Sequence, residues 1–144
     1  MKSVLRIFIA LVLANGIAFS STTQAGIAVI VSPDNASSPM NKKEVARLFL
    51  KKNKTFRTGM KAEPLDQSND DATRNSFYKN VVNKNPSQLS SYWSKMIFTG
   101  RATPPIMVGN DENVINFVLN NINAIGYIDT KSVDKRVKVL LTVK

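Results

Sequence analysis

The strongest restriction on the fold comes from an apolar run near the start of the chain, "GIAVIVS" at residues 26–32. The run is rich in β-branched residues and stops at "SPDN", where a proline and turn-forming residues follow. A strand without a polar face is buried on both sides. We therefore predict a buried strand over 26–32, within a sheet that helices cover.

Helical and extended patterns alternate through the rest of the chain. Helices are predicted where apolar residues recur every three or four positions, at 41–52, 73–82, 85–98 and 111–121. Two further strands are predicted at 124–129 and 136–143. This alternation favours an α/β domain, a mixed sheet flanked by helices.

Prolines and helix-capping residues give further information on where the predicted helices and strands begin and end. Pro64 in "KAEPLDQ" cannot donate a hydrogen bond to a neighbouring strand, so this segment is predicted to be irregular or an edge strand. The stretch 99–110 contains two consecutive prolines and is predicted to be a long non-helical connection. Asn41 and Asn85 are predicted N-caps, and Trp93 is the predicted core anchor of its helix.

Residues 1–25 have the pattern of a secretory signal peptide. Two cations precede an apolar run from Ile7 to Ala14, and small and polar residues follow. A membrane anchor is the alternative, but the run is shorter than the about 20 residues that a span needs. We predict cleavage after Ala25, a periplasmic location, and a single domain formed by residues 26–144.

Cysteine and histidine are both absent from the sequence. Their absence excludes disulfides, thiolate metal sites and the commonest general base. We therefore predict that the chain is not an enzyme and holds no metal or cofactor. A hard cation bound by carboxylates is the alternative, but the sequence has no Asp-rich calcium-loop pattern. The formal net charge is +10, and removal of Lys2 and Arg6 with the signal peptide leaves +8. Such a charge attracts anions of many kinds without selecting among them.

The stretch "DQSNDDATRNSF", which starts at Asp66, begins a predicted helix. Helix starts bind anions because their first N–H groups are unpaired and the dipole favours negative charge. However, Asp66, Asp70 and Asp71 outnumber Arg74 here, and acids in a first turn also stabilise a helix without any ligand. Asn69 or Asp70 as the cap would contribute about 1 kcal/mol. The stretch is therefore either an anion site or only a well-capped helix.

Several stretches resemble periplasmic phosphate-binding proteins. "MNKKEVARLFLKKNKTFRTG" is similar to their segment in which a helix leads into a Gly-Lys turn and an aromatic residue. "LDQSNDDATRNSF" is similar to their Arg-Ser-Asp-Gly-Ser-Gly-Thr stretch, and "NAIGYID" to the strand that closes their second lobe. "YWSKMIFTGRATPP" is similar to small exported proteins of the phosphate substrate-binding type. The resemblance covers most of residues 26–143 and implies one lobe of the type 2 periplasmic-binding fold.

The resemblance also implies an oxyanion site and no catalysis. Ser68 and Thr73 match the serine and threonine of the family stretch, and their hydroxyls can donate to phosphate oxygens. Gln67 stands where the family has its arginine, so a bidentate charged ligand is replaced by a neutral amide.

Three charged residues complete the predicted site. Arg74 lies on the first helical turn and would replace the missing charge if its side chain turns toward the loop. Asp71 stands at a family serine. Asp70 or Asp71 would accept a hydrogen bond from protonated phosphate, which fully ionised sulfate does not offer.

Other cations are less specific. "KKNK" at 51–54, together with Arg57, forms a basic helix end that suits the helix dipole and could also contact lipid headgroups. Arg101 lies in a loop before the two prolines and is interpreted as solvated. Nucleic acid is not expected as a partner because no aromatic residues interleave with these lysines.

The leading hypothesis is an exported binding protein for phosphate or a similar oxyanion, linked to ABC-type uptake or sensing. The predicted domain is about half the size of a two-lobed binding protein, so a half-cleft would bind weakly or be completed by a second lobe. A transporter permease is the other expected partner. The alternative is an interaction module that docks on an envelope transporter or sensor without a small ligand.

Overall fold

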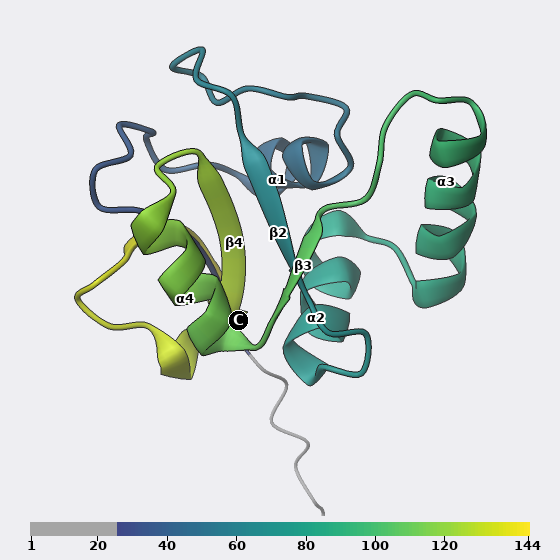
Figure 1. The fold of residues 1–144 in the computed structure, drawn as a ribbon. Helices are drawn as coiled ribbons and strands as arrows, with labels where there is room; N and C mark the ends of the chain where they lie inside the picture. The colour runs from purple at the N-terminus through teal and green to yellow at the C-terminus, as the bar shows by residue number, and fades with distance from the viewer. Residues whose placement is uncertain (1–25) are drawn as a thin grey trace, which may run out of the picture.

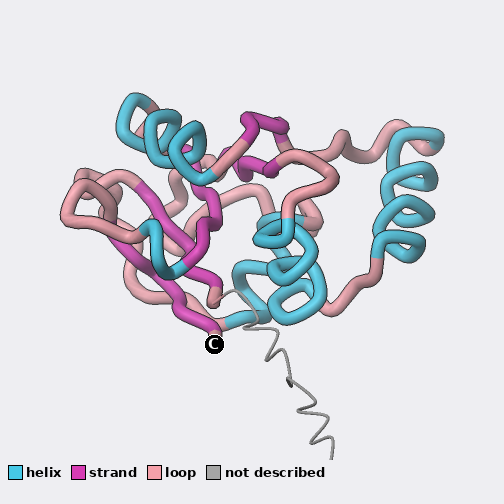
Figure 2. Tube along the Cα trace, turned by 90° about the horizontal axis from the view of Figure 1, so that it is seen from below, coloured by secondary structure: helices cyan, strands magenta, loops and turns pink. Residues whose placement is uncertain are grey.

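The computed structural model describes residues 26–144 as a five-stranded sheet with helices on both faces (Figures 1 and 2). The predicted α/β fold, a mixed sheet flanked by helices, is confirmed. The predicted signal peptide and its cleavage site lie outside the described residues. The elements follow the order β1 (Ile27–Val31), α1 (Lys42–Phe49), β2 (Glu63–Gln67), α2 (Ala72–Phe77), the π-helical turn η1 (Tyr78–Val82), α3 (Pro86–Phe98), β3 (Ile106–Gly109), α4 (Asp111–Asn120), β4 (Ala124–Asp129), the 3-10 turn η2 (Thr130–Ser132) and β5 (Lys138–Val143).

The strand order is β3-β2-β4-β1-β5. The strands β2, β3 and β4 run parallel, whereas β1 is antiparallel to both of its neighbours. In the register of β1, Ile27 pairs with Asp129 on one side and with Val143 on the other. Because β2, β3 and β4 are parallel, their carboxyl ends, at Gln67, Gly109 and Asp129, meet at one edge of the sheet.

Helices cover both faces of the central strands, which explains the unbroken apolar run of β1. Ile27, Val29 and Val31 point into a core that also contains apolar residues of α1, α2, η1 and α3. Ala28 and Ile30 point into a second core, built mainly with α4. Figure 2 shows α4 on one side of the strands and the other helices on the opposite side, with α3 standing outermost.

The helix boundaries agree with the predicted caps. Asn41 and Asn85 each form a capping box at the start of α1 and α3. Trp93 is buried in the first core, as predicted. Within residues 26–144, none of the helices combines the length and the apolar character that a bilayer crossing requires.

The prediction that the segment around Pro64 is irregular or an edge strand is wrong, because β2 lies between β3 and β4. Proline is tolerated here because the pairing of β2 with β4 and its pairing with β3 begin at different residues. The Glu63 N–H donates to Asn123 O at 2.8 Å on the β4 side, so the next nitrogen faces the other side. On that side the pairing with β3 starts only at Leu65. The missing N–H of Pro64 therefore leaves no gap in the ladder.

The predicted non-helical connection at 99–110 contains the short strand β3, which sequence reasoning missed. This strand has four residues and directly follows Pro104 and Pro105, so its own pattern was too short to detect. It forms the outer edge of the sheet, and its Ile106 and Met107 side chains are 45% and 51% exposed.

The close packing of β4 against α4 gives a first prediction. A Cβ atom added to Gly126 would lie 2.3 Å from Val114 Cγ1, and a β-branched side chain in a helix has little freedom to move away. We expect Gly126→Ala to lower the free energy of unfolding by about 1–3 kcal/mol. Chemical denaturation measures this loss.

The matched control is the double variant Gly126→Ala/Val114→Ala, in which the smaller helix residue makes room for the new methyl group. The two substitutions should be less destabilising together than the sum of their separate effects. Strict additivity would contradict the proposed close contact.

Candidate functional site

A buried carboxylate lies at the end of β2. Asp66 is 4% exposed and accepts hydrogen bonds from three side chains. Arg74 Nη2 and Tyr78 Oη donate to Asp66 Oδ2 at 3.1 and 3.0 Å, and Tyr127 Oη donates to Oδ1. Arg74 Nε also lies 3.2 Å from both carboxylate oxygens. The charge of Asp66 is therefore compensated inside the protein.

The Arg74 side chain is part of this cluster. Its guanidinium forms an ion pair with Asp66 and lies over the Tyr78 ring, 4.8 Å from the centroid. Burial lowers the pKa of the Arg74 guanidinium, but the charge and hydrogen bonds of Asp66 outweigh burial, and the pKa lies above its ordinary value. The role predicted for Arg74 depended on its side chain turning toward the loop, and in this structure the side chain turns toward Asp66.

Gln67 is also directed inward. Its side chain is fully buried, and Nε2 donates to Asp111 Oδ1 at 2.7 Å and to Tyr127 O at 2.8 Å. Among the described residues, no donor reaches its buried Oε1. The amide thus connects β2 with β4 and with the start of α4.

The loop after β2 has the hydrogen bonds of a helix cap. Asp71 is the N-cap of α2, and its carboxylate accepts from the Thr73 N–H at 2.7 Å. The Asp71 N–H in turn donates to Ser68 O at 3.0 Å. The prediction of Asn69 or Asp70 as the cap is wrong by one or two residues, because the helix starts only at Ala72.

Asp111 is the residue that sequence reasoning missed. Besides the Gln67 amide, its carboxylate accepts from the Asp129 N–H at 3.1 Å and from Ser132 Oγ at 2.6 Å. It therefore joins β2, α4 and the end of β4. Its place just after the end of β3 would have been the signal, but the sequence analysis did not predict that strand.

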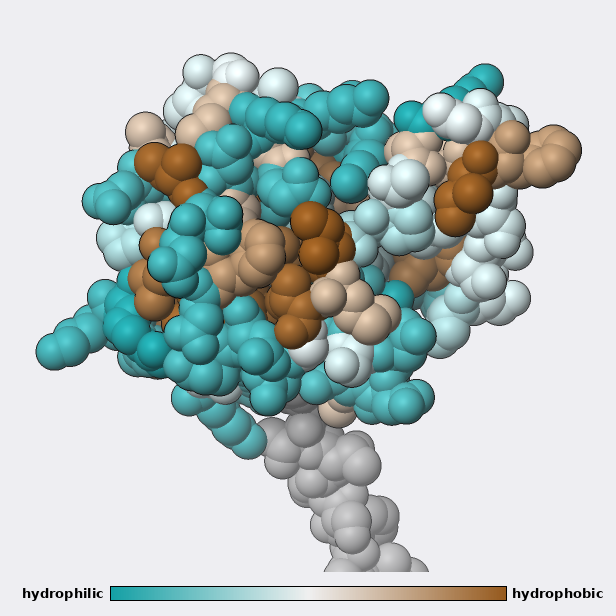
Figure 3. Space-filling model, viewed as in Figure 1, coloured by the Kyte–Doolittle hydropathy of each residue, from teal (hydrophilic) through white to brown (hydrophobic). Residues whose placement is uncertain are grey.

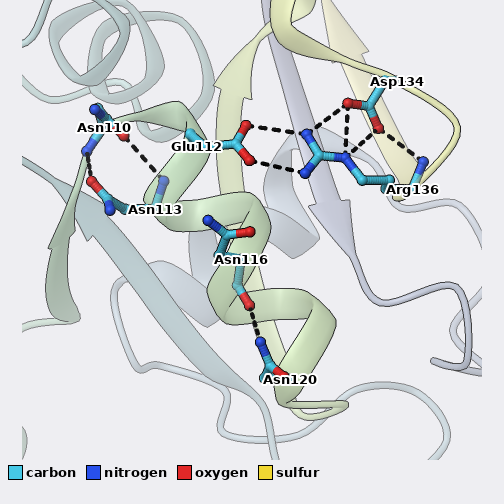
Figure 4. Close-up of polar contacts among 7 residues, drawn as sticks. All are labelled: Asn110, Glu112, Asn113, Asn116, Asn120, Asp134 and Arg136. Atoms are coloured by element: carbon cyan, nitrogen blue, oxygen red, sulfur yellow. Dashed lines mark hydrogen bonds and ion pairs between the residues drawn. The ribbon is translucent and has the colours of Figure 1, made fainter.

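The start of α4 carries a second charged group (Figure 4). Asn110 and Asn113 form a capping box. In the same turn, Glu112 points away from the capping box and accepts from Arg136 at 2.9 and 3.1 Å, and Arg136 also pairs with Asp134. The hydrogen bonds from Arg136 lower the pKa of both carboxyl groups.

These elements surround a pocket of about 340 Å³ at the carboxyl edge of β2, β3 and β4, which we call the carboxyl-edge pocket. Its lining residues are Asp71, Thr73, Asn110, Asp111, Glu112 and Ser132. The lining contains three carboxylates and no cation. In open α/β sheets, the crevice outside the carboxyl ends of the strands is the usual place for a ligand.

The predicted site residues are thus only partly brought together. Asp71 and Thr73 line the carboxyl-edge pocket. Ser68 and Asp70 are exposed on the loop beside it. The side chains of Gln67 and Arg74 instead contact Asp111 and Asp66. The role of these two side chains in binding an anion stays a prediction.

Comparison with known proteins supports the fold. No protein-family profile matches the sequence. No curated protein matches it. Among solved structures, the chain is similar to a protein from Clostridium perfringens assigned as a phosphate ABC transporter substrate-binding protein, with phosphate bound. That likeness has a TM-score of 0.65 and 19% identity, over 81% of this chain and 44% of the other.

Two further structures agree. An ABC-type phosphate transport receptor from Vibrio cholerae matches with a TM-score of 0.62 and 17% identity, over 81% of this chain and 45% of the receptor. PstS from Borrelia burgdorferi matches with a TM-score of 0.57 and 17% identity, over 81% of this chain and 47% of PstS. The resemblance to phosphate-binding proteins is therefore confirmed at the level of the fold. This chain spans less than half the length of these structures.

The Asp66 cluster gives a prediction on stability. Arg74→Ala would leave a buried carboxylate without its cation, so we expect it to lower the free energy of unfolding by about 3 kcal/mol. Arg136→Ala is the matched control, since Arg136 pairs with carboxylates on the exposed surface and its loss should cost less than about 1 kcal/mol. Equal losses in chemical denaturation would contradict a structural role for the buried pair.

The tyrosines give a prediction on pH dependence. Burial raises the pKa of Tyr78, Tyr92 and Tyr127, and the charge of Asp66 raises it further for Tyr78 and Tyr127. The folded protein therefore keeps protons that the unfolded chain releases above its ordinary pKa of about 10. Their stabilising contribution should be complete below that pH and fall as the pH rises beyond it.

Ultraviolet absorbance of tyrosinate measures this effect. The folded protein should ionise its tyrosines at higher pH than the same protein in denaturant. Coincident titration curves would show that the three hydroxyls are not buried as described.

Proposed function

We propose that this chain is an exported binding protein for phosphate or a similar oxyanion, and that the carboxyl-edge pocket forms one wall of its site. The observation that carries the proposal is the convergence of three parallel strand ends and the start of α4 on this pocket. The capping box occupies the Asn110 and Asn113 N–H groups, while the other N–H groups of the first turn have no partner within a helix and point along its axis. The fold shared with phosphate-binding proteins supports the same assignment.

The carboxylates of the pocket suit a protonated oxyanion. Asp71 and Asp111 present acceptor oxygens, and the Thr73 hydroxyl can donate. A hydrogenphosphate ion carries an O–H that such an acceptor can bind, whereas sulfate at neutral pH has none. The wall therefore selects for phosphate by accepting a hydrogen bond from its O–H as well as donating hydrogen bonds.

The same carboxylates limit the affinity of the chain alone. A carboxylate about 4 Å from an anionic charge opposes binding by about 4 kcal/mol near a protein surface. One charge-assisted hydrogen bond contributes about 1.5–3 kcal/mol, so the donors of this wall do not offset two such carboxylates. Tight binding therefore requires cations from a second lobe or a partner, in keeping with the chain's spanning less than half of its structural neighbours.

The proposal includes the cellular setting. Residues 1–25 direct export to the periplasm, residues 26–144 act as one domain, and the chain serves ABC-type phosphate uptake or sensing. Its function is binding and not catalysis.

An interaction module without a small ligand is the second candidate, and an exposed apolar surface favours it. Ile106 and Met107 lie on the edge strand β3, and Ile97 and Phe98 at the end of α3 are 55% and 93% exposed. Figure 3 shows exposed apolar side chains in several separate groups on this face of the molecule. Such surfaces mark sites of protein association.

Calorimetric titration with phosphate and with sulfate tests the proposal. We expect saturable phosphate binding in the millimolar range, which is about 4 kcal/mol of binding free energy, and weaker binding of sulfate. Asp71→Asn should weaken the preference for phosphate while keeping the helix cap, since asparagine caps as well as aspartate. Asp70→Asn is the control, because Asp70 lies on the same loop outside the pocket lining.

Two results would contradict the proposal. One is the absence of both binding heat and thermal stabilisation at millimolar phosphate, which would favour the interaction module. The other is an unchanged preference for phosphate over sulfate in Asp71→Asn.

A further inference from the structure

Two basic segments that are 50 residues apart in the sequence meet at the opposite end of β2. The helix end around Lys51 and the loop around Arg101 both line a pocket of about 220 Å³, which we call the basic pocket. Lys54 and Lys61 complete its four cations, and Asn53 and Thr103 add polar groups. The lining also contains the start of β2, whereas the carboxyl-edge pocket lies beyond the end of that strand. The five residues of β2, a strand about 13 Å long, lie between the two pockets.

Backbone hydrogen bonds hold these cations in place. The chain leaves α1 with Lys51 in the left-handed region, at φ 53°. The Ala62 N–H donates to Lys54 O at 2.9 Å, and Thr55 and Lys61 form an isolated bridge, so Lys54 and Lys61 lie on the two legs of one turn. The Arg101 N–H donates to Met96 O at 3.0 Å and fixes the loop after α3.

The positive charge of the basic pocket is largely uncompensated. Glu63 is the single acid of the lining, and its Oε1 lies 3.8 Å from Lys51 Nζ. Among residues 26–144, the side chains of Lys54, Lys61 and Arg101 form no ion pair. Four cations and one acid leave a net charge of +3 on the lining.

We propose that the basic pocket binds a phosphoryl group. Its volume is below the about 300–1,000 Å³ of pockets for larger organic ligands, so it suits a compact anion. An arginine can contact phosphate with two parallel hydrogen bonds, and lysines act as point charges around it. The phosphoryl group has two possible sources, free phosphate and the headgroup of an anionic phospholipid at a membrane surface.

Two binding measurements on the purified protein at about 0.1 M ionic strength, where the Debye length is about 10 Å, test the proposal and separate the sources. One is calorimetric titration with inorganic phosphate, and the other is co-sedimentation with phosphatidylglycerol vesicles, with phosphatidylcholine vesicles as the neutral reference. The test variant is Lys61→Gln/Arg101→Gln, in which both side chains are exposed and the backbone contacts stay available. The matched control is Lys131→Gln/Lys135→Gln, which removes the same charge outside the basic pocket.

We expect the test variant to bind at least about tenfold more weakly, since each lost charge-assisted hydrogen bond costs about 1.5–3 kcal/mol. The control should change affinity by less than about twofold, because exposed charges beyond a Debye length are screened. Loss confined to the phosphate titration assigns the site to free phosphate, and loss confined to the vesicles assigns it to a lipid headgroup; either supports the proposal.

Equal weakening by the test and control variants would overturn the proposal, because general charge would then account for binding. Binding of neither phosphate nor phosphatidylglycerol vesicles would overturn it as well. The variant Asp71→Asn keeps this test separate from the carboxyl-edge pocket, since it should not change the binding that Lys61→Gln/Arg101→Gln removes.

Discussion

The buried carboxylate of Asp66 is the interaction on which the rest of the structure depends. A charge removed from water has to be compensated locally, and here Arg74, Tyr78 and Tyr127 do so from three different elements. The ring of Tyr127 stacks on Phe77 at 3.9 Å, so the polar cluster continues directly into the aromatic core. This cluster fixes the direction of α2 and of the loop before it, and it withdraws the one nearby arginine from that loop.

The parts of the fold that rest on local patterns could be predicted from the sequence. The apolar run of β1 and the caps Asn41 and Asn85 are local signals, and the structure confirms them. The prediction was wrong where pairing with a neighbouring strand determines the structure. Pro64 is acceptable in an inner strand because β3 begins pairing one residue later, and the four residues of β3 become a strand through pairing with β2.

The candidate site was less predictable, because its side chains are directed by distant partners. Gln67 turns inward to reach Asp111 and the Tyr127 carbonyl, which lie 44 and 60 residues further along the chain. Arg74 turns toward Asp66, which lies only eight residues away but points into the core. Nothing in a local pattern distinguishes a cation that faces a ligand from one that neutralises a buried acid, so the motif correctly located a helix start and not the orientation of its charges.

The antiparallel pairing of β1 with β5 has a consequence for how this fold is combined with other chains. Since Ile27 pairs with Val143, the two ends of the described domain are separated by a single interstrand spacing of about 5 Å. A unit with adjacent ends can be inserted into a loop of a host protein without rearranging its core. It can also be circularly permuted, which joins these two ends and places the new ends in another loop. The fold of residues 26–144 therefore suits transfer as one continuous segment, for example as an insertion within a larger protein.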